Sequence, residues 1–437
     1  DYNTMKKQIY SLSLLFISIL FIPSSPLYGQ RKTPDDIIGE LLQQNNIFEL
    51  NRQYPIYKNR INPRLKSLAS ALLHNAYNEI DPTIEALEEL VTNHPDLGID
   101  NALNLINLWG NLLIKKGEYK EAYTLITKQL ADKTVQQQAN GTTLIHLKNT
   151  QNKAKALQKQ PKSSLERSAT PSVVSLIDGN KVPVQVNGKE ALFIFDTGAD
   201  VPAFVSKQFA EEHHIKIFNQ TITTGGVVGS DYTQIGFVDS LKIGNLVYRN
   251  FWTLVAPNNQ ILYNDTVIAE VDAVLGRHFM ERVGEFHLYS TENKIVFPVR
   301  PTPPPQEKNL LVINGQPYIE VKLNGKKYPL HLDTGGGIAL YSKYYNENKS
   351  WIVKRGIKEV LGIGGFGGAK QLSIYMLPTM ELTIAGVPTF LEEVPIYTTD
   401  EIRISQDGYG MLGMDILSRF YKVIVSFNNQ FLKIERL

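Results

Sequence analysis

The second half of this chain contains the same pattern of residues twice, and that repetition limits the folds open to it. Each copy has an Asn-Gly pair, then Asp-Thr-Gly nine residues after the Asn, then a glycine 29 residues after the Asp, and an apolar-apolar-Gly turn whose glycine lies 80 residues after the Asp. The landmarks are Asn187, Asp196, Gly225 and Gly276 in the first copy and Asn324, Asp333, Gly362 and Gly413 in the second. One Asp-Thr-Gly alone is a weak signal. Four landmarks in one register indicate two related folded units.

Both copies have the residue pattern of β-strands. From about Thr170, β-branched and aromatic residues alternate with polar ones, and glycines interrupt them. Each Asn-Gly predicts a tight hairpin whose second strand runs directly into the Asp. Consecutive prolines favour an extended spacer that cannot join a sheet interior. We therefore expect two β-rich units, at 169–300 and 308–437, joined by a Pro-rich linker at 301–307.

The preceding region, 31–168, has the spacing of helices. Apolar residues recur at intervals of three and four, Asp81-Pro82 predicts a helix start, and Pro95 predicts its end. The spacing of Gly110, Leu113, Gly117, Tyr119 and Ala122 resembles a tetratricopeptide (TPR) repeat. We expect a TPR-like helical domain, serving as a buttress or as a peptide-docking surface, with a polar linker at its end.

The first 30 residues have the pattern of an export signal. Lys6 and Lys7 precede an apolar run from Ile9 to Ile22, which Pro23 and small residues follow. This run is short for a spanning helix and typical of a secretory signal. We expect a periplasmic or secreted protein without stable membrane insertion; the alternative is an uncleaved anchor.

Composition excludes several function classes. The net charge of +2 gives no electrostatic basis for binding nucleic acid. The absence of cysteine excludes disulfides, thiol catalysis and Cys-ligated zinc. His213-His214 are adjacent, so a regular element points them to different sides, and we expect no metal and no cofactor.

Both copies resemble the retropepsin-like aspartic proteases, the family that includes retroviral proteases and the lobes of pepsin. The residues that carry the resemblance are Asp196-Thr197-Gly198-Ala199-Asp200, Leu275-Gly276-Arg277 and the glycine-rich stretch from Gly362 to Gly368. It covers about Val173 to Leu437. It implies an α plus all-β multidomain chain, with two closed-barrel, acid-protease-like lobes related by a pseudo-twofold axis and one active site between them.

The resemblance also implies roles for individual residues. Asp196 and Asp333 become the catalytic pair of an aspartic endopeptidase, sharing one proton so that one acts as base and the other as acid. Thr197 and Thr334 are expected to reach the backbone of the opposite lobe, and Gly198 and Gly335 to allow a tight loop. The substrate is expected to be an extended polypeptide. The flap and groove residues are Asp200, Arg277, Gly225, Gly226, Gly364, Gly365 and Phe366, and Tyr232 is a further flap candidate.

The two copies differ around this pair. Asp200 and Arg277 are expected to form an ion pair by the groove, whereas the second copy has Gly337 and Met414 at the matching positions. This predicts unequal substrate sites, unless Asp200 is simply an exposed loop residue. Ala199 and Gly336 stand where pepsin-type lobes have Ser or Thr, so a hydroxyl that supports the outer carboxylate oxygen is missing.

Three alternatives remain open. The lobes could bind a peptide or glycan without cutting it, as a pseudo-protease. The helical domain could do the work, as a helical-repeat adaptor. The lobes could also pair between chains, although we favour a monomer in which they pair within one.

Overall fold

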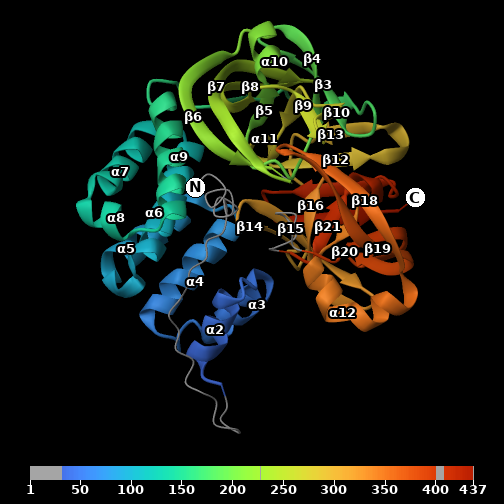
Figure 1. The fold of residues 1–437 in the computed structure, drawn as a ribbon, viewed down its shortest axis with the longest axis horizontal. Helices are drawn as coiled ribbons and strands as arrows, with labels where there is room; N and C mark the ends of the chain where they lie inside the picture. The colour runs from blue at the N-terminus through green and yellow to red at the C-terminus, as the bar shows by residue number, and fades with distance from the viewer. Residues whose placement is uncertain (1–31, 227, 400–407, 437) are drawn as a thin grey trace. The chain divides into compact units, whose positions relative to one another are not determined.

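The computed structural model describes residues 32–226, 228–399 and 408–436, and it divides into two compact units. One unit is helical and runs to Lys159; the other begins at Gln160 and is built mainly of strands (Figure 1). Residues Val312–Asn314 group with the helical unit. The expected export signal lies outside the described residues, and an extracytoplasmic location stays a prediction that cell fractionation tests.

The helical unit is a series of packed helices. Its elements are α2 (Pro34–Gln43), α3 (Ile47–Tyr57), α4 (Pro63–Ala76), α5 (Ile80–Asn93), η1 (Pro95–Leu97), α6 (Ile99–Lys115), α7 (Tyr119–Ala131), α8 (Lys133–Gln138) and α9 (Gly141–Leu157). Helix α6 packs on both α7 and α9. Gly110 allows this approach, because a Cβ there would lie 2.9 Å from Ile126 Cδ1 and 3.1 Å from Thr150 Cγ2. The TPR-like assignment stays a prediction.

Two expectations about the helical region were wrong at its edges. Helix α5 begins at Ile80, after Glu79, so Pro82 lies within the first turn and Asp81 is not its N-cap. Proline is tolerated there because the first turn has no intrahelical partner for its amides. The segment expected to be a linker contains β1 (Ser164–Glu166), which pairs with β8 of the strand-rich unit.

The first lobe, residues 164–297, is built around one eight-stranded sheet with the order β1-β8-β5-β11-β4-β3-β7-β6. Strand β7 also pairs with β8. Beyond β1, its elements are β2 (Ser172–Ser175), β3 (Lys181–Val186), β4 (Lys189–Phe195), β5 (Ala203–Ser206), α10 (Lys207–Glu212), β6 (Lys216–Gly225), β7 (Ser230–Ile243), β8 (Leu246–Ala256), β9 (Gln260–Tyr263), β10 (Thr266–Glu270), β11 (Ala273–Leu275), α11 (Arg277–Val283), β12 (Glu285–Tyr289), η2 (Ser290–Glu292) and β13 (Lys294–Phe297).

The second lobe, residues 310–435, has a sheet with the order β14-β15-β16-β21-β17-β20-β19-β18, and β15 also pairs with β19. Its elements are β14 (Leu310–Ile313), β15 (Gln316–Leu323), β16 (Lys326–Asp333), β17 (Ala339–Leu340), α12 (Ser342–Arg355), β18 (Ile357–Gly365), β19 (Gly368–Ile384), β20 (Val387–Tyr397), β21 (Gly410–Gly413), α13 (Met414–Leu417), β22 (Lys422–Ser426) and β23 (Phe431–Glu435). The additional pairing in each lobe is what barrel closure requires; the closed barrels themselves stay a prediction.

The two lobes use the same hairpin to deliver their aspartates. Asn187-Gly188 and Asn324-Gly325 all have positive φ, between 46° and 85°. These angles fit a two-residue turn of the kind that Asn-Gly favours. The turns join β3 to β4 and β15 to β16, and both pairs are antiparallel. The hairpins predicted from Asn-Gly are therefore confirmed.

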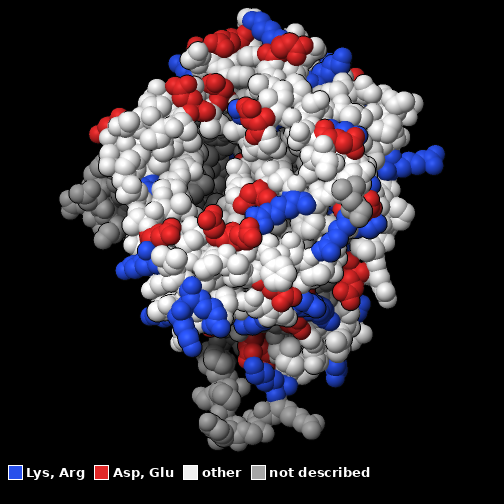
Figure 2. All heavy atoms as spheres, turned by 90° about the vertical axis from the view of Figure 1, so that its right-hand side faces the viewer, with Lys and Arg blue, Asp and Glu red and all other residues white. Residues whose placement is uncertain are grey.

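Charges are mixed over the face of the molecule drawn in Figure 2. Lys and Arg side chains lie among Asp and Glu side chains there and do not gather by sign. Within residues 32–226, 228–399 and 408–436, no helix has both the length and the apolar character needed to cross a membrane.

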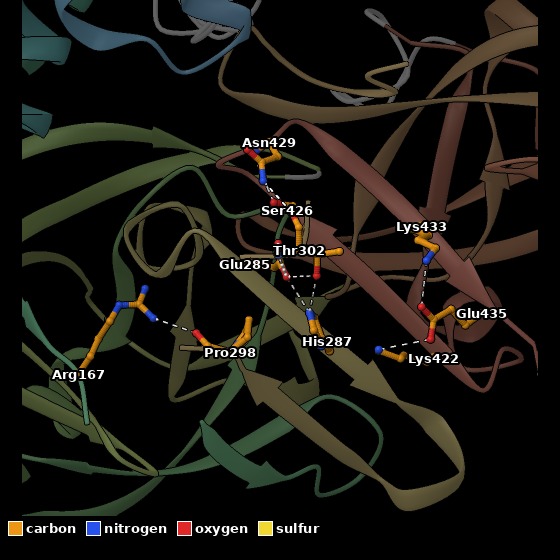
Figure 3. Close-up of polar contacts among 10 residues, drawn as sticks. All are labelled: Arg167, Glu285, His287, Pro298, Thr302, Lys422, Ser426, Asn429, Lys433 and Glu435. Atoms are coloured by element: carbon orange, nitrogen blue, oxygen red, sulfur yellow. Dashed lines mark hydrogen bonds and ion pairs between the residues drawn. The ribbon is translucent and has the colours of Figure 1, made fainter. Parts of the chain in front are cut away.

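A five-stranded sheet joins the lobes, in the order β2-β13-β12-β22-β23. Strand β12 of the first lobe pairs antiparallel with β22 of the second. The Pro-rich linker is fastened to this sheet by Thr302, whose amide lies 3.0 Å from both carboxylate oxygens of Glu285 and whose Oγ1 donates to Oε1 at 2.6 Å. In Figure 3, dashed lines join Glu285 to Thr302 and to His287. The Asn429 side-chain amide donates to the Thr302 carbonyl at 2.9 Å.

Candidate active site

Asp196 and Asp333 stand at equivalent places in the two lobes. Asp196 follows β4, and Asp333 is the last residue of β16. Beside each strand lies the strand of an apolar-Gly turn in parallel pairing, β11 next to β4 and β21 next to β16. The aspartates thus stand where two strands end in mostly buried residues, and they start tight loops.

The threonines hold these two loops to each other. Thr197 Oγ1 donates to the Leu332 carbonyl at 2.7 Å, and Thr334 Oγ1 donates to the Phe195 carbonyl at 2.6 Å. Each hydroxyl also accepts the backbone N–H of the other threonine at 3.0 Å. Both threonines have no exposed surface. The cross-lobe contacts expected from the resemblance are therefore present, and they are reciprocal.

The loop glycines bring the two carboxyl groups together. Gly198 N–H donates to Asp196 Oδ1 at 2.7 Å, and Gly335 N–H donates to Asp333 Oδ1 at 2.9 Å. A Cβ on Gly198 would lie 2.7 Å from Asp333 Oδ2, and one on Gly335 would lie 2.7 Å from Asp196 Oδ2. Only glycine leaves room for the opposite carboxyl group at these positions.

This arrangement favours one retained proton. Burial raises the pKa of Asp196 and of Asp333 above the usual range, and the nearby charge of Asp333 raises the pKa of Asp196 further. The Asp333 side chain keeps 13% exposure, so a small molecule can reach it. A pair that shares a proton offers a base and an acid in one place.

The apolar-Gly turns lie directly behind the loops that carry Asp196 and Asp333. Arg277 N–H donates to the Ala199 carbonyl at 2.8 Å, and Met414 N–H donates to the Gly336 carbonyl at 2.9 Å. A Cβ at Gly276 or Gly413 would clash with the loop backbone, with Val201 in the first lobe and Gly336 in the second. These turns therefore fix the backs of both loops.

Arg277 and Asp200 form the expected ion pair, within a larger network. The Arg277 guanidinium contacts Asp200 and Glu281, and its Nη2 donates to the Gly315 carbonyl of the second lobe at 2.9 Å. The side chains of Arg277 and Glu281 are each 2% exposed, whereas that of Asp200 is 45% exposed. Asp200 is thus half exposed and still paired, and it also lies 2.9 Å from His278 Nε2.

The second lobe supports its loop with a different carboxylate. Both Asp415 carboxylate oxygens lie 3.0 Å from the backbone amide nitrogen of Ile338, just after the loop that carries Asp333. Asp415 also fills the space beside Gly337, where a Cβ would lie 3.4 Å from its Oδ2. The first lobe therefore uses a carboxylate on the loop, and the second uses one from the turn behind it.

The glycine-rich hairpins of the two lobes meet at their tips. The β6–β7 loop, with Gly226 and Gly229, contacts Phe366 and Gly367 at the tip of the β18–β19 hairpin. The Phe366 ring crosses to the first lobe and packs edge-on against Phe204, with ring centroids 4.9 Å apart. The structure thus shows flaps in mutual contact.

The shared spacing of 29 residues does not mark equivalent points on the two flaps. In the first lobe, the last pair of residues before the tip of the β6–β7 hairpin is Gly225 and Ser230. In the second lobe, the last pair before the tip of the β18–β19 hairpin is Gly365 and Gly368. Gly362 lies three residues earlier. Glycines carry no side chain that fixes register, so the shared spacing alone does not locate the tip; the flap residues named from the sequence, Gly364, Gly365 and Phe366, do lie at it. Gly364 lies on β18 just before that tip, and Tyr232 is 66% exposed on β7.

Three site residues were not identified from the sequence, although each leaves a signal there. His331 lies two residues before Asp333, as a polar residue in an apolar strand. Glu281 lies four residues after Arg277, the spacing of a helical ion pair. Asp415 follows the second apolar-Gly turn. In the part of the chain that the structure describes, no group of three or more His, Cys, Asp or Glu could hold a metal ion.

Comparison with known proteins supports the reading of the first lobe. Residues 182–279 match a family model described as aspartyl protease. The crystal structure of a retropepsin-like aspartic protease from Rickettsia conorii is similar at 16% identity over 31% of this chain and 93% of that chain, with a TM-score of 0.20, which is too low to support an argument about fold. None of the curated proteins compared with the chain matches it. The family match includes Asp196, Thr197, Gly198, Asp200 and Arg277, so the resemblance of the first lobe to aspartyl proteases is confirmed.

Proposed function

We propose that this chain is an aspartic endopeptidase whose catalytic pair is Asp196 and Asp333. The observation that carries the proposal is the reciprocal hydrogen bonding of Thr197 and Thr334, which holds two half-buried carboxyl groups against each other. The aspartyl protease match over 182–279 adds support for the first half of the pair. Two carboxyl groups held together repel each other when both are ionised, which is unfavourable unless they share a proton. This arrangement therefore favours acid–base catalysis over peptide binding alone.

The chemistry follows from one shared proton. The ionised carboxylate takes a proton from a water as its oxygen attacks the peptide carbonyl, and the protonated carboxyl donates its proton to the carbonyl oxygen. A gem-diol forms and the pair has exchanged roles. The first carboxyl then gives its proton to the departing nitrogen while the second takes one from a gem-diol hydroxyl. The C–N bond breaks, an acid and an amine leave, and the pair again holds one proton.

The flaps support an extended polypeptide as substrate. The hairpins β6–β7 and β18–β19 meet at their tips, and glycine-rich strands leave their backbone free to pair with an added strand. Entry of a peptide requires the Phe366 ring to leave Phe204. The Arg277 network in the first lobe and Asp415 in the second make the two ends of the groove unequal.

The test is cleavage of fluorescently labelled casein from pH 3 to 8. We compare the parent with Asp196→Asn and Asp333→Asn, which keep the shape of the side chain and remove its acid–base function. We expect each variant to lose at least about 100-fold in rate, because general acid–base groups contribute about 10²–10⁴-fold. The matched control is Asp239→Asn on the exposed part of β7, which should cleave like the parent.

The same experiment separates the pseudo-protease. If the parent binds labelled casein at every pH without cutting it, and both Asn variants bind equally well, the endopeptidase proposal is wrong. If the Asn variants cut as fast as the parent, the catalytic pair has been misassigned.

A further inference from the structure

His331 is a buried histidine directly beside the catalytic pair. It lies two residues before Asp333 on β16, and alternate residues of a strand face the same side. Its side chain is 1% exposed, and the matching position of the first lobe, two residues before Asp196, is Ile194. The imidazole is therefore present on one side of the pair only.

The two ring nitrogens of His331 have different surroundings. Nε2 lies 2.7 Å from Gln316 Oε1, an amide oxygen that can only accept a hydrogen bond, so Nε2 carries the ring proton. Nδ1 is buried and has no hydrogen-bond partner. It lies 4.0 Å from Asp333 Oδ2. A buried acceptor thus faces the carboxyl group.

The oxygen that Nδ1 faces is Asp333 Oδ2, whereas Asp333 Oδ1 accepts the Gly335 N–H at 2.9 Å. The backbone N–H of Gly336 also donates to the Asp333 carboxyl group, but Gly336 has no hydroxyl to add to it. Within the pair alone, the charge and hydrogen bond of Asp333 raise the pKa of Asp196, which favours a proton on Asp196. The imidazole opposes this preference, because an ionised oxygen beside an imidazole lone pair is unfavourable, whereas a proton on Oδ2 satisfies both atoms. The gap of 4.0 Å must close by about 1 Å for a full hydrogen bond, and catalytic hydrogen bonds are often long before substrate binds.

We propose that His331 is a positioning residue that accepts a hydrogen bond from protonated Asp333 Oδ2, so that Asp333 starts each turnover as the acid and Asp196 as the base. This inference rests on the proposed endopeptidase function. In the first step Asp196 takes the proton of the water while Asp333 gives its proton to the carbonyl oxygen. His331 exchanges no proton in this sequence; it fixes where the shared proton begins.

Burial keeps the His331 ring neutral above about pH 4. Burial lowers the pKa of His331 to about 4, although the Asp196 charge opposes this, and Arg277 lowers it further. The centroid of the Tyr318 ring lies 5.7 Å from that of His331, and Tyr341 lies near enough to Asp333 for the Asp333 charge to raise the pKa of Tyr341. Burial raises the pKa of Tyr341 well above the usual range, so its hydroxyl stays neutral. Above about pH 4, Nδ1 is therefore unprotonated and able to accept a hydrogen bond from Asp333.

The first test is the pH profile of kcat/KM for casein cleavage by His331→Leu. Without the acceptor, the shared proton leaves the pair more easily, so the basic limb should move to lower pH by about one unit, the effect of one hydrogen bond. The acid limb should also move to lower pH. In the parent, protonation of His331 near pH 4 removes the hydrogen-bond acceptor, and this event does not occur in His331→Leu. The matched control Ile194→Val should keep both limbs of the parent. A purely structural role predicts a uniform loss of rate with both limbs unmoved, and that result would overturn the inference.

The second test keeps the histidine and changes its partner. Gln316→Glu places a carboxylate against Nε2–H, which favours the imidazolium and should move the acid limb to higher pH. This variant decides the matter if His331→Leu does not fold. An acid limb at the parent's pH in Gln316→Glu would contradict the inference.

A third measurement does not depend on turnover. In protein labelled with ¹⁵N-histidine, the His331 signals are identified by their loss in His331→Leu or, if that variant is unfolded, in His331→Gln. We expect an Nε2–H tautomer near neutral pH, and a shift of the Nδ1 resonance in Asp333→Ala but not in Asp239→Ala. An Nδ1–H tautomer, or an Nδ1 signal indifferent to Asp333, overturns the inference even if casein is cleaved. If casein is not cleaved but these shifts appear, the proposed function fails and the link between His331 and Asp333 stands.

Discussion

At the scale of single residues, Arg277 shows how much of the site depends on one buried charge. Its side chain is 2% exposed and contacts Glu281, Asp200 and the Gly315 carbonyl. Burial works against the guanidinium charge, but the charges of Glu281 and Asp200 outweigh it and raise the pKa of Arg277. The sequence pointed to Asp200 alone as its partner, and the fully buried partner is Glu281.

Replacement of Arg277 by Met should destabilise the protein by about 3–5 kcal/mol, because Glu281 then loses its partner in a buried position. The urea midpoint of unfolding measures this. Arg277→Met combined with Glu281→Leu should recover a large part of the loss, since no carboxylate is left unpaired. A midpoint for Arg277→Met equal to that of the parent would show that the network adds nothing to stability.

At the scale of elements, the linker between the lobes is held more firmly than its prolines suggest. Glu285 begins β12, and its side chain is 2% exposed. Its carboxylate forms hydrogen bonds with the backbone N–H of Thr302, the hydroxyl of Thr302 and the His287 ring. Burial alone would raise the pKa of Glu285, but hydrogen bonds from His287, Thr302 and Ser426 lower it below the usual value. A composition rich in proline predicts an extended spacer, yet it cannot show which residue is tied to a sheet.

This contact predicts a pH dependence of stability. The pKa of Glu285 is lower in the folded protein than in the unfolded chain, where it is about 4.3. The carboxylate therefore adds to the free energy of unfolding above about pH 4.3, and this contribution is lost as the pH falls through the folded-state pKa. Glu285→Gln should therefore be less stable than the parent by about 1.5–3 kcal/mol at pH 6–7, and the difference should narrow below about pH 4. Urea unfolding from pH 3 to 7 measures it. The exposed Glu292→Gln is the control and should follow the parent; a constant difference for Glu285→Gln at every pH would contradict the role given to its charge.

At the scale of the whole strand-rich unit, the two lobes complete one site within one chain. The β12–β22 pairing and the four threonine hydrogen bonds connect the two lobes. The monomer expected from the sequence, with its lobes paired within one chain, stays a prediction.

Mixing two inactive variants tests lobe pairing directly. Asp196→Asn and Asp333→Asn, unfolded together and refolded, should show no more casein cleavage than either variant alone, because each chain pairs its own lobes. If lobes paired between chains, some pairs would combine two intact aspartates and activity would return. The control is the parent taken through the same refolding, which must recover its cleavage.

The sequence by itself determined the local features of this protein. Asn-Gly required positive φ and produced the hairpins, Asp-Thr-Gly placed the pair at strand ends, and Pro95 ended α5, because each of these depends on residues adjacent in the chain. Only the tertiary structure decided which distant groups meet. Three contacts depend on the register of strands far apart in sequence: the hydrogen bond from Thr302 to Glu285, the packing of the Phe366 ring against Phe204, and the approach of His331 Nδ1 to Asp333. That register is set by the packing of whole sheets, which no short motif specifies.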